Sequence, residues 1–435
     1  MNAVIIAGGK GIRLGKITKE TPKPMIKIGN LPILGHQLKH LKEYNIKNVI
    51  ILTGYLAEII ENYVQKNNFG LNVTCLKSNL ELGNADRVKL AEKYLSNDFL
   101  VFYGDVMGDI DIERFIAFHK KKGGAATLAI HPNDHPHDSD LVEIDENQRI
   151  IAFHPKKKHP RYYQNLVNAG IYILSPRIFK YIGAQTGKEL DFGKNIFPGL
   201  IKKEKIFGYN TPEYRKDMGT PERLKQVEKD YASGKIAARN LKNKQRAIFL
   251  DRDGTINDDP GSDLWDINKF KIPTGSIKAV KLINQSRYLA IVITNQPVIA
   301  KGFASPEDLE QIHRKMETLF GKDGAKLDAI YHCPHHPERG YPEANVKYVI
   351  QCGCRKPQPG MIKKAEKDSN IDLKNSYMIG DSLRDVLCGK NAGTKTILVG
   401  SEKKYRKKLH GKIDQKMRLP DHFAKSLYQA VKFIS

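Results

Sequence analysis

Short apolar runs recur along the whole chain, and each is separated from the next by a stretch long enough for an amphipathic helix. In the first half the runs occupy residues 3–7, 49–52, 99–103 and 126–130, and in the second half residues 247–250, 289–294, 377–379 and 396–399. Strands that alternate with helices in this way fold into α/β domains with mainly parallel sheets. The pattern therefore predicts an α/β fold.

The length of 435 residues favours two domains, because single cores rarely grow past about 250–300 residues. Residues 233–246 are polar, basic and without strong periodicity. We place a linker at 233–245, between a first domain over 1–232 and a second over 246–435. Each domain is expected to be Rossmann-like, with a mainly parallel sheet flanked by helices.

The chain carries 72 lysine and arginine residues against 48 acidic ones, a formal net charge of +24. The basic residues are scattered, with only short clusters such as 120–122 and 156–158, and no zinc-finger, homeodomain or RNA-recognition motif organises them. A positive field also suits an enzyme whose substrates are phosphate esters. We therefore expect no nucleic-acid partner.

No apolar stretch approaches the length of a membrane-spanning helix, and residues 3–7 lack the basic flank and cleavage site of a signal peptide. These features predict a cytoplasmic protein with no membrane partner. The odd number of cysteines, five, argues against a disulfide framework in such a chain. Nothing in the sequence indicates an oligomeric state.

A glycine-rich turn, residues 8–13 (GGKGIR), follows the first apolar run. Glycines there let backbone amides approach a phosphate closely, and Arg13 can add a bidentate contact. The turn lacks the Gly-Lys-Ser/Thr of a Walker loop, and glycine turns after strands also occur as plain structure. Lys23, between Pro22 and Pro24, lies in a segment predicted to be stiff and extended, either as a fixed cation or as a solvated loop lysine.

Two acidic residues complete this group of motifs. Asp105 follows the apolar run 99–103, at the strand end where α/β sites gather, and Asp217 opens the segment 217–222 (DMGTPE) before a predicted helix. The turn at 8–13, the Pro-Lys-Pro-Met segment and these two acids occur in the order of the sugar nucleotidyltransferase family. The chain resembles that family from residue 1 to about residue 230.

The resemblance implies a nucleoside triphosphate site made by Gly8, Gly9, Lys10, Gly11, Arg13 and Lys23. It also implies that Asp105 and Asp217 hold Mg²⁺, while Arg13 and Lys23 neutralise charge in catalysis. The sugar phosphate attacks the α-phosphorus directly, so the reaction needs positioning and neutralisation, without a protein nucleophile.

The sugar is expected to contact Asn168. Of the Glu-Lys pair that usually precedes that strand in the family, residues 153–156 (FHPK) keep only Lys156, which is also expected to bind the substrate. Residues 82–86 (LGNAD) depart from the family's base-proximal LGTAG segment. Which base is bound therefore stays open at the level of motifs.

A second group of motifs begins after the apolar run 247–250, with residues 251–255 (DRDGT). Two acids spaced i, i+2 at a strand end, Asp251 and Asp253, can converge on one phosphate and one metal, or form a plain acidic turn. Thr294 supplies a hydroxyl at the next strand end, and residues 355–357 (RKP) supply cations. Asp381 brings a third carboxylate to another strand end.

These motifs resemble the haloacid dehalogenase superfamily over residues 246–435. The resemblance implies that Asp251 attacks phosphorus, while Asp253 protonates the leaving oxygen and then deprotonates water. Thr294 and Lys356 neutralise the transferring phosphoryl group. The Mg²⁺ site is expected at Asp251, the carbonyl of Asp253, and Asp381. Substrate contacts are expected from Asn295, Arg355, Lys356 and Ser382.

Three of the five cysteines, Cys333, Cys352 and Cys354, lie within 22 residues of one another. With His335 they form two closely spaced pairs, which suits a closed tetrahedral Zn²⁺ site rather than chance clustering. His336 is an alternative fourth ligand. A zinc ion with four protein ligands has no open position, so we expect it to fold a loop that faces the substrate.

The zinc motif narrows the resemblance to the heptose-bisphosphate phosphatase family, a relative of the histidinol phosphatases, through residues 333–336 (CPHH) and 352–357 (CGCRKP). Arg355 is then expected to bind the end of the substrate that keeps its phosphate. The two halves together imply a heptose bisphosphate, a sugar 1-phosphate and a nucleoside triphosphate, by pathway logic GTP, as substrates. Residues 297–298 (PV), where relatives often have Ser-Gly, suggest the α-anomer.

Two alternatives remain open on sequence alone. One is a histidinol-phosphate-type phosphatase fused to a nucleotidyltransferase for another sugar or another nucleotide. The other is a non-catalytic regulator or scaffold, against which the complete acidic set and Lys23 argue.

Overall fold

The computed structural model describes residues 1–183, 189–258, 261, 263–409 and 419–434. It divides into two compact units. The first unit comprises Met1–His131, Asp140–Pro155 and Leu166–Asn240. The second comprises Pro132–Ser139, Lys156–Asn165 and Leu241–Ser435.

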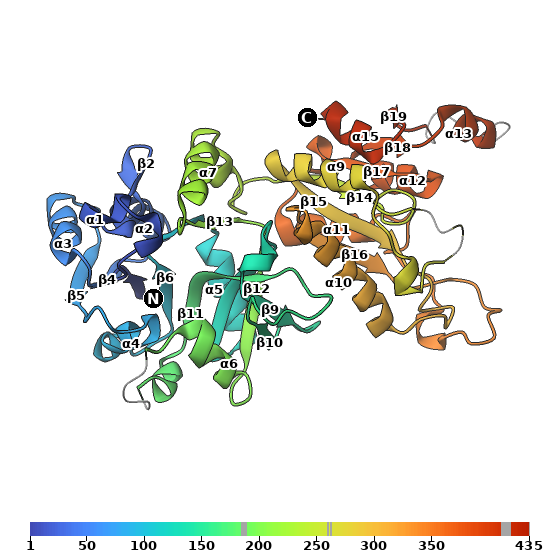
Figure 1. Ribbon diagram of the computed structural model, residues 1–435. Coiled ribbons are helices and arrows are strands. Elements are labelled where there is room, and N and C mark those ends of the chain that lie inside the picture. The colour runs from blue at the N-terminus through green and yellow to red at the C-terminus, as the bar shows by residue number, and fades with distance from the viewer. Residues whose placement is uncertain (184–188, 259–260, 262, 410–418, 435) are drawn as a thin grey trace. The chain divides into compact units, whose positions relative to one another are not determined.

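The first unit is built on a nine-stranded sheet in the order β10-β9-β11-β6-β1-β4-β5, with β8 attached to β11 and β12 to β8 (Figure 1). Its strands are β1 (Ala3–Ile6), β4 (Asn48–Thr53), β5 (Asn72–Lys77), β6 (Phe99–Tyr103), β8 (Ala126–His131), β9 (Leu141–Ile144), β10 (Ile150–His154), β11 (Val167–Leu174) and β12 (Ile206–Asn210). β1 pairs in parallel with β4 and β6, but β11 runs antiparallel to β6. The sheet is therefore parallel on one side and mixed on the other.

Two short ribbons accompany this sheet: β7 (Val106–Asp109) with β13 (Tyr214–Asp217), and β2 (Lys27–Ile28) with β3 (Leu31–Pro32). The helices are α1 (Ile17–Glu20), α2 (Ile33–Glu43), α3 (Ala57–Lys66), α4 (Asn84–Lys89), α5 (Ile112–Lys122), α6 (Phe197–Leu200), α7 (Pro221–Ala232) and α8 (Lys235–Ala238). Both faces of the sheet are buried, because Val4 packs in one apolar cluster while Ala3 and Ile5 pack in another.

The second unit contains a six-stranded, wholly parallel sheet in the order β16-β15-β14-β17-β18-β19. Its strands are β14 (Arg246–Leu250), β15 (Tyr288–Asn295), β16 (Ala329–Cys333), β17 (Tyr377–Gly380), β18 (Lys395–Val399) and β19 (His422–Ala424). In chain order this is the doubly wound arrangement, whose ligands bind where the strand order reverses, beside the carboxyl end of the first strand. That strand is β14.

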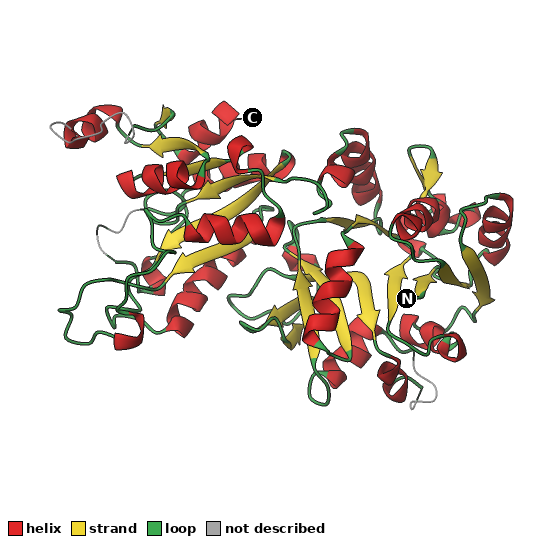
Figure 2. Ribbon diagram, turned by 180° about the vertical axis from the view of Figure 1, so that it is seen from behind, coloured by secondary structure: helices red, strands yellow, loops and turns green. Residues whose placement is uncertain are grey.

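Helices cover both faces of this second sheet (Figure 2). They are α9 (Thr274–Gln285), α10 (Pro306–Lys322), α11 (Gly360–Ser369), α12 (Leu383–Ala392), α13 (Glu402–Leu409) and α15 (Leu427–Ile434). Ile248 and Leu250 of β14 pack with α9, α10 and α15, whereas Ala247 and Phe249 pack with α11 and α12. The α/β prediction is thus confirmed for both units.

The second unit includes two segments from the N-terminal half of the sequence, Pro132–Ser139 and Lys156–Asn165. The Tyr163 amide donates to Thr318 Oγ1 of α10 at 3.0 Å, and the Gln164 amide group donates to Glu310 of the same helix at 3.2 Å. Tyr163 and Asn165 are buried. This unit therefore extends beyond the predicted range 246–435.

The predicted linker is partly helical. The segment 233–245 contains α8, with Ile236 buried, and the two units meet in the sequence between Asn240 and Leu241, which are also buried. Within the part of the chain that the structure describes, no helix combines the length and apolar character needed to cross a membrane.

Candidate active sites

The glycine-rich turn of the first unit directly follows β1. Gly9, Lys10 and Arg13 are exposed, and Gly11 has a φ of +68° that favours glycine. A β-carbon on Gly11 would lie 2.8 Å from Lys23 Cγ, so the turn and Lys23 are in close contact. The structure thus brings the predicted triphosphate residues together at the carboxyl end of β1.

Lys23 reaches Asp105, which follows β6: its Nζ lies 2.9 Å from Asp105 Oδ2. The prediction that Lys23 lies in an extended segment is wrong. Pro22 is extended, but Lys23 begins a 3₁₀ turn, Lys23–Met25, closed by a hydrogen bond from the Ile26 amide to the Lys23 carbonyl. The turn still fixes the lysine against the strand end.

Asp217 ends β13 beside Asp105, because the Met218 amide donates to the Asp105 carbonyl at 3.1 Å. A β-carbon on Gly219 would lie 2.7 Å from Asp217 Oδ1 and 2.9 Å from Arg13 Nη2, so only glycine leaves room for both side chains. Arg13, Lys23, Asp105 and Asp217 therefore form one group. Two carboxylates on neighbouring strand ends, each facing cations, are a donor set that fits Mg²⁺.

The two residues predicted to contact the sugar, Asn168 and Lys156, belong to different compact units. Asn168, at the start of β11, donates through Nδ2 to the Tyr172 hydroxyl at 2.9 Å and accepts from the Gly170 amide at 3.0 Å. Lys156 is exposed and belongs to the second unit. The contacts of Lys156 and Asn168 with the sugar stay predictions.

The segment that departs from the family's base-proximal pattern has an internal role. Asn84 donates to Asp191 at 2.5 Å and accepts from the Phe192 amide at 2.7 Å. Asp86 accepts from the amides of Gly83 and Leu190. Asn84 and Asp86, the two departures from the family's segment, thus connect α4 to residues 190–192 by hydrogen bonds.

Sequence reasoning missed Arg87, which is buried below the turn that follows β1. Its guanidinium donates to Ser78 Oγ and to the carbonyls of Leu80 and Leu82. A β-carbon on Gly8 would collide with Arg87 Nη1, so the glycine is required there by close packing. A buried arginine directly after a helix start was the available signal.

In the second unit, Asp251 follows β14 and Asp381 follows β17, at the reversal of strand order. Carboxylate oxygens of Asp251, Asp381 and Asp385 all lie within 4.8 Å of one another. Lys356 Nζ lies 2.6 Å from Asp251 Oδ1 and 2.6 Å from Asp385 Oδ1. The sequence analysis missed Asp385. This residue lies on α12, four residues after Asp381, which is the length of about one helical turn.

These buried charges perturb one another. Burial raises the pKa of Asp251 well above its usual range, and the nearby Asp385 adds to the shift while Lys356 opposes it. Burial lowers the pKa of Lys356, but the two carboxylates outweigh it and leave this pKa raised. Three carboxylates around one ammonium leave an excess of negative charge, which a divalent cation would offset. The oxygen donors fit Mg²⁺.

Asp253 does not join this carboxylate group through its side chain. Its carboxylate accepts from Arg252 Nε at 3.0 Å and Nη2 at 2.9 Å, and also from Gln296 and Asn257. Burial raises the pKa of Asp253, but these donors, above all the fully buried Arg252, lower it below the usual value. Of the Asp253 oxygens, only the backbone carbonyl is left for the predicted Mg²⁺ site.

Three predicted substrate contacts have internal partners. Asn295 donates to the Lys356 carbonyl at 3.1 Å and accepts from the Lys356 amide at 2.9 Å, so it positions Lys356. The Ser382 hydroxyl donates to Asp385 at 2.5 Å. Arg355 Nη1 donates to the His335 carbonyl at 3.0 Å. The named polar atoms of Asn295 and Ser382 bond within the protein, and contact of these two residues with a substrate stays a prediction.

We expect Asn295→Ala to lower the phosphatase kcat by roughly 10- to 100-fold, because a displaced Lys356 no longer fits the phosphoryl group. Two backbone groups of Lys356 would lose their partners, at about 1–3 kcal/mol each if they stay buried. Asn391→Ala is the matched control, since it removes an exposed hydrogen bond to the neighbouring Pro357 carbonyl. Equal losses in both variants would contradict the positioning role, and steady-state kinetics of phosphate release measure it.

The four predicted zinc ligands converge. The sulfur of Cys354 lies 3.2 Å from that of Cys352 and 3.3 Å from that of Cys333, and 3.4 Å from His335 Nδ1. A tetrahedral zinc site with Zn–S bonds of 2.3 Å has edges of about 3.6–3.8 Å, so a slight expansion accommodates the ion. His335 is the histidine that lies in this group, whereas His336 Nδ1 accepts from the Glu338 amide.

The cysteine cluster is linked to the catalytic group at two points. Cys354 precedes Lys356 by two residues, and the Cys333 carbonyl accepts from the Gln296 amide at 2.7 Å. Gln296 in turn donates to Asp253 and to Thr294 Oγ1. The cluster therefore anchors both Lys356 and the residues around Asp253.

Comparison with known proteins agrees with both halves of this description. Residues 2–234, just over half of the chain, match the nucleotidyl transferase family. Residues 353–430 match a HAD-hydrolase-like family. The resemblances seen in the sequence are thus confirmed.

Three curated relatives show the same division. A D-glycero-beta-D-manno-heptose-1,7-bisphosphate 7-phosphatase of Haemophilus ducreyi is 43% identical over 153 residues, 35% of this chain and 81% of the relative. A D-glycero-alpha-D-manno-heptose-1,7-bisphosphate 7-phosphatase of Burkholderia mallei is 39% identical over 156 residues, 36% of this chain and 80% of the relative. "Probable mannose-1-phosphate guanylyltransferase 1" of Oryza sativa subsp. japonica is 31% identical over 241 residues, 54% of this chain and 63% of the relative, so the chain spans just under two thirds of that protein.

Proposed function

Because the chain belongs to the nucleotidyl transferase family through residues 2–234, and in its C-terminal part to the heptose-1,7-bisphosphate 7-phosphatase family, we propose that this bifunctional enzyme catalyses two consecutive steps of nucleotide-activated heptose synthesis. The second unit removes the 7-phosphate of D-glycero-D-manno-heptose 1,7-bisphosphate. The first unit joins the resulting heptose 1-phosphate to GTP, giving GDP-heptose and pyrophosphate. The observation that carries the proposal is the group Asp251, Asp381, Asp385 and Lys356 at the strand reversal.

In the phosphatase step an Asp251 oxygen bonds to phosphorus as the bond from phosphorus to the sugar oxygen breaks. Asp253, which carries the proton taken from water in the preceding turnover, gives that proton to the sugar oxygen, and later takes one from the water that hydrolyses the aspartyl phosphate. The carboxylate form of Asp253, held by four N–H contacts, is the form that accepts the proton from water. Thr294 and Lys356 offset the charge on the phosphoryl oxygens.

Two metals complete this unit. Mg²⁺, held by Asp251, Asp381 and the Asp253 carbonyl, supplies charge neutralisation at the phosphoryl group. Asp385 supports the same group through Lys356. A zinc ion on Cys333, His335, Cys352 and Cys354 is structural, because all four positions are protein ligands.

In the transferase step a phosphate oxygen of the sugar 1-phosphate attacks the α-phosphorus of GTP, and pyrophosphate leaves. Arg13 and Lys23 offset the developing charge, and the amides of residues 8–11 face the triphosphate. Asp105 and Asp217 hold the Mg²⁺ that neutralises the phosphates. The assignment of guanine as the base is supported by the likeness to a guanylyltransferase. Residues 84 and 86 give no evidence on the base, because their side chains bond within the protein.

The expected preference for the α-anomer of the bisphosphate was suggested by residues 297 and 298. Pro297 and Val298 are buried, and Val298 packs with Ile299 and Leu309, so core packing accounts for this apolar pair. The expectation of an α-anomer therefore rests on the fused transferase, which consumes one anomer of the sugar 1-phosphate. The names of the relatives include both anomers.

The test supplies each anomer of heptose 1,7-bisphosphate with GTP, UTP, CTP or dTTP, and identifies the products by mass spectrometry. We expect release of one phosphate and one pyrophosphate per GDP-heptose, with the α-anomer preferred. Histidinol phosphate serves as the competing phosphatase substrate. Faster hydrolysis of histidinol phosphate, or faster turnover of another nucleotide, would contradict the assignment.

A further inference from the structure

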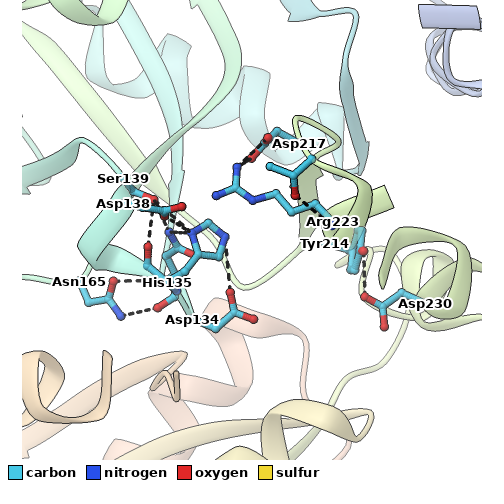
Figure 3. Close-up of polar contacts among 11 residues, drawn as sticks. Asp134, His135, Asp138, Ser139, Asn165, Tyr214, Asp217, Arg223 and Asp230 are labelled. Atoms are coloured by element: carbon cyan, nitrogen blue, oxygen red, sulfur yellow. Dashed lines mark hydrogen bonds and ion pairs between the residues drawn. The ribbon is translucent and has the colours of Figure 1, made fainter. Parts of the chain in front are cut away.

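Arg223, on the first turn of α7, makes a close ion pair with Asp217 (Figure 3). Its Nη1 lies 2.9 Å from Asp217 Oδ1 and 2.8 Å from Asp217 Oδ2. One positive nitrogen thus sits almost equally far from both oxygens of the carboxylate. That is where a cation bound by both oxygens would be.

The second carboxylate of the expected metal site is paired in the same way, by Lys23 Nζ at Asp105. The Asp217 side chain is 38% exposed and that of Arg223 16%, so the pair is open to an arriving ion. A metal ion cannot bind both oxygens of Asp217 while Arg223 lies between them. Metal binding through both oxygens therefore requires Arg223 to move.

We propose that Arg223 is the resident cation of Asp217 and exchanges partners during the reaction cycle. The divalent ion replaces it on the carboxylate, and the released guanidinium binds the polyphosphate chain of the incoming nucleotide. This inference rests on the proposed function, in which Asp217 holds the metal. Arg13, beside Asp217, already marks this side of the site as positively charged.

The exchange has a signature that a purely structural arginine lacks. Removing Arg223 removes a competitor of the metal but also a partner of the phosphates, so the two affinities should change in opposite directions. We expect Arg223→Gln to bind Mn²⁺ roughly 1.5- to 5-fold more tightly, the range of a partly exposed ion pair. It should bind magnesium tripolyphosphate roughly 10-fold more weakly, because a charge-assisted contact is lost.

The measurement uses the full chain carrying Asp251→Asn and Asp381→Asn, so that the phosphatase carboxylates do not bind the probe. Free Mn²⁺ is followed by electron paramagnetic resonance, and magnesium tripolyphosphate, which has no base, by titration calorimetry. Tyr214→Phe is the matched control: it removes a hydrogen bond from β13 to Asp230 of α7 and leaves the Asp217 pair intact. It should change neither affinity.

Two variants separate the possible failures. Asp217→Asn should weaken Mn²⁺ binding, and if it does not, both the metal role of Asp217 and the exchange are wrong. If Asp217→Asn weakens Mn²⁺ binding but Arg223→Gln does not shift the two affinities in opposite directions, only the exchange is overturned. Arg223→Lys, which keeps the charge, should lie between the wild type and Arg223→Gln in both titrations.

Discussion

Asp251→Asn should abolish phosphate release from the bisphosphate while leaving sugar-nucleotide formation from heptose 1-phosphate unchanged. The amide cannot attack phosphorus, and loss of a covalent nucleophile costs roughly 10⁴- to 10⁶-fold in kcat. The variant should fold, since it removes one of two buried carboxylates that repel each other and Lys356 keeps Asp385 as its partner. Release of phosphate and of pyrophosphate are measured separately on the same preparation.

Asp323→Asn, which alters an exposed aspartate after α10, is the control for a carboxylate change in the same unit. It should leave both activities at the wild-type level. The transferase residues and the phosphatase residues lie in separate compact units, with their own cores. Loss of transferase activity in well-folded Asp251→Asn protein would therefore contradict two independent sites.

The double replacement Cys352→Ser and Cys354→Ser should remove the single tightly bound zinc ion and, with it, phosphatase activity. Structural zinc contributes about 10–16 kcal/mol of apparent binding free energy at neutral pH, which is as large as the stability of many domains. Residues 334–351 contain one 3₁₀ turn, Val346–Tyr348, and end directly before Cys352. Without the metal the loop keeps contacts such as the hydrogen bond from the Asn345 amide to the Ala300 carbonyl, but Cys354, two residues before Lys356, loses its anchor, so Lys356 should lose its position.

Metal content is measured by mass spectrometry of the dialysed protein, and both activities are assayed before and after chelation. Added Mg²⁺ should not restore phosphate release. Cys75→Ser, in the first unit, should keep both the zinc and the phosphatase activity. Full phosphatase activity in protein shown to be free of zinc would rule out the structural role.

Much of the fold was readable from the sequence, because a buried parallel strand leaves a local mark. The run at 247–250 is apolar on both faces, and the structure packs alternate residues against helices on opposite sides of the sheet. The orientation of β11 was not readable, since its antiparallel pairing with β6 depends on the path of the chain between them. The membership of Tyr163 and Gln164 in the second unit was not readable either, because it rests on contacts with α10 more than 140 residues away.

The sequence alone pointed to residues that the structure brings together: Lys23 with Asp105, Asp251 with Asp381, and the cysteine–histidine group. The reason is that short motifs after a strand fix their own backbone, so residue type and position are encoded together.

The tertiary structure alone decided the partners of those residues. It placed Asp385 against Lys356, gave Asn295 and Ser382 partners within the protein, and set Arg223 on Asp217. The partner of a side chain depends on which face of a helix each residue occupies and on how segments distant in the chain pack together. Neither property leaves a local pattern in the sequence.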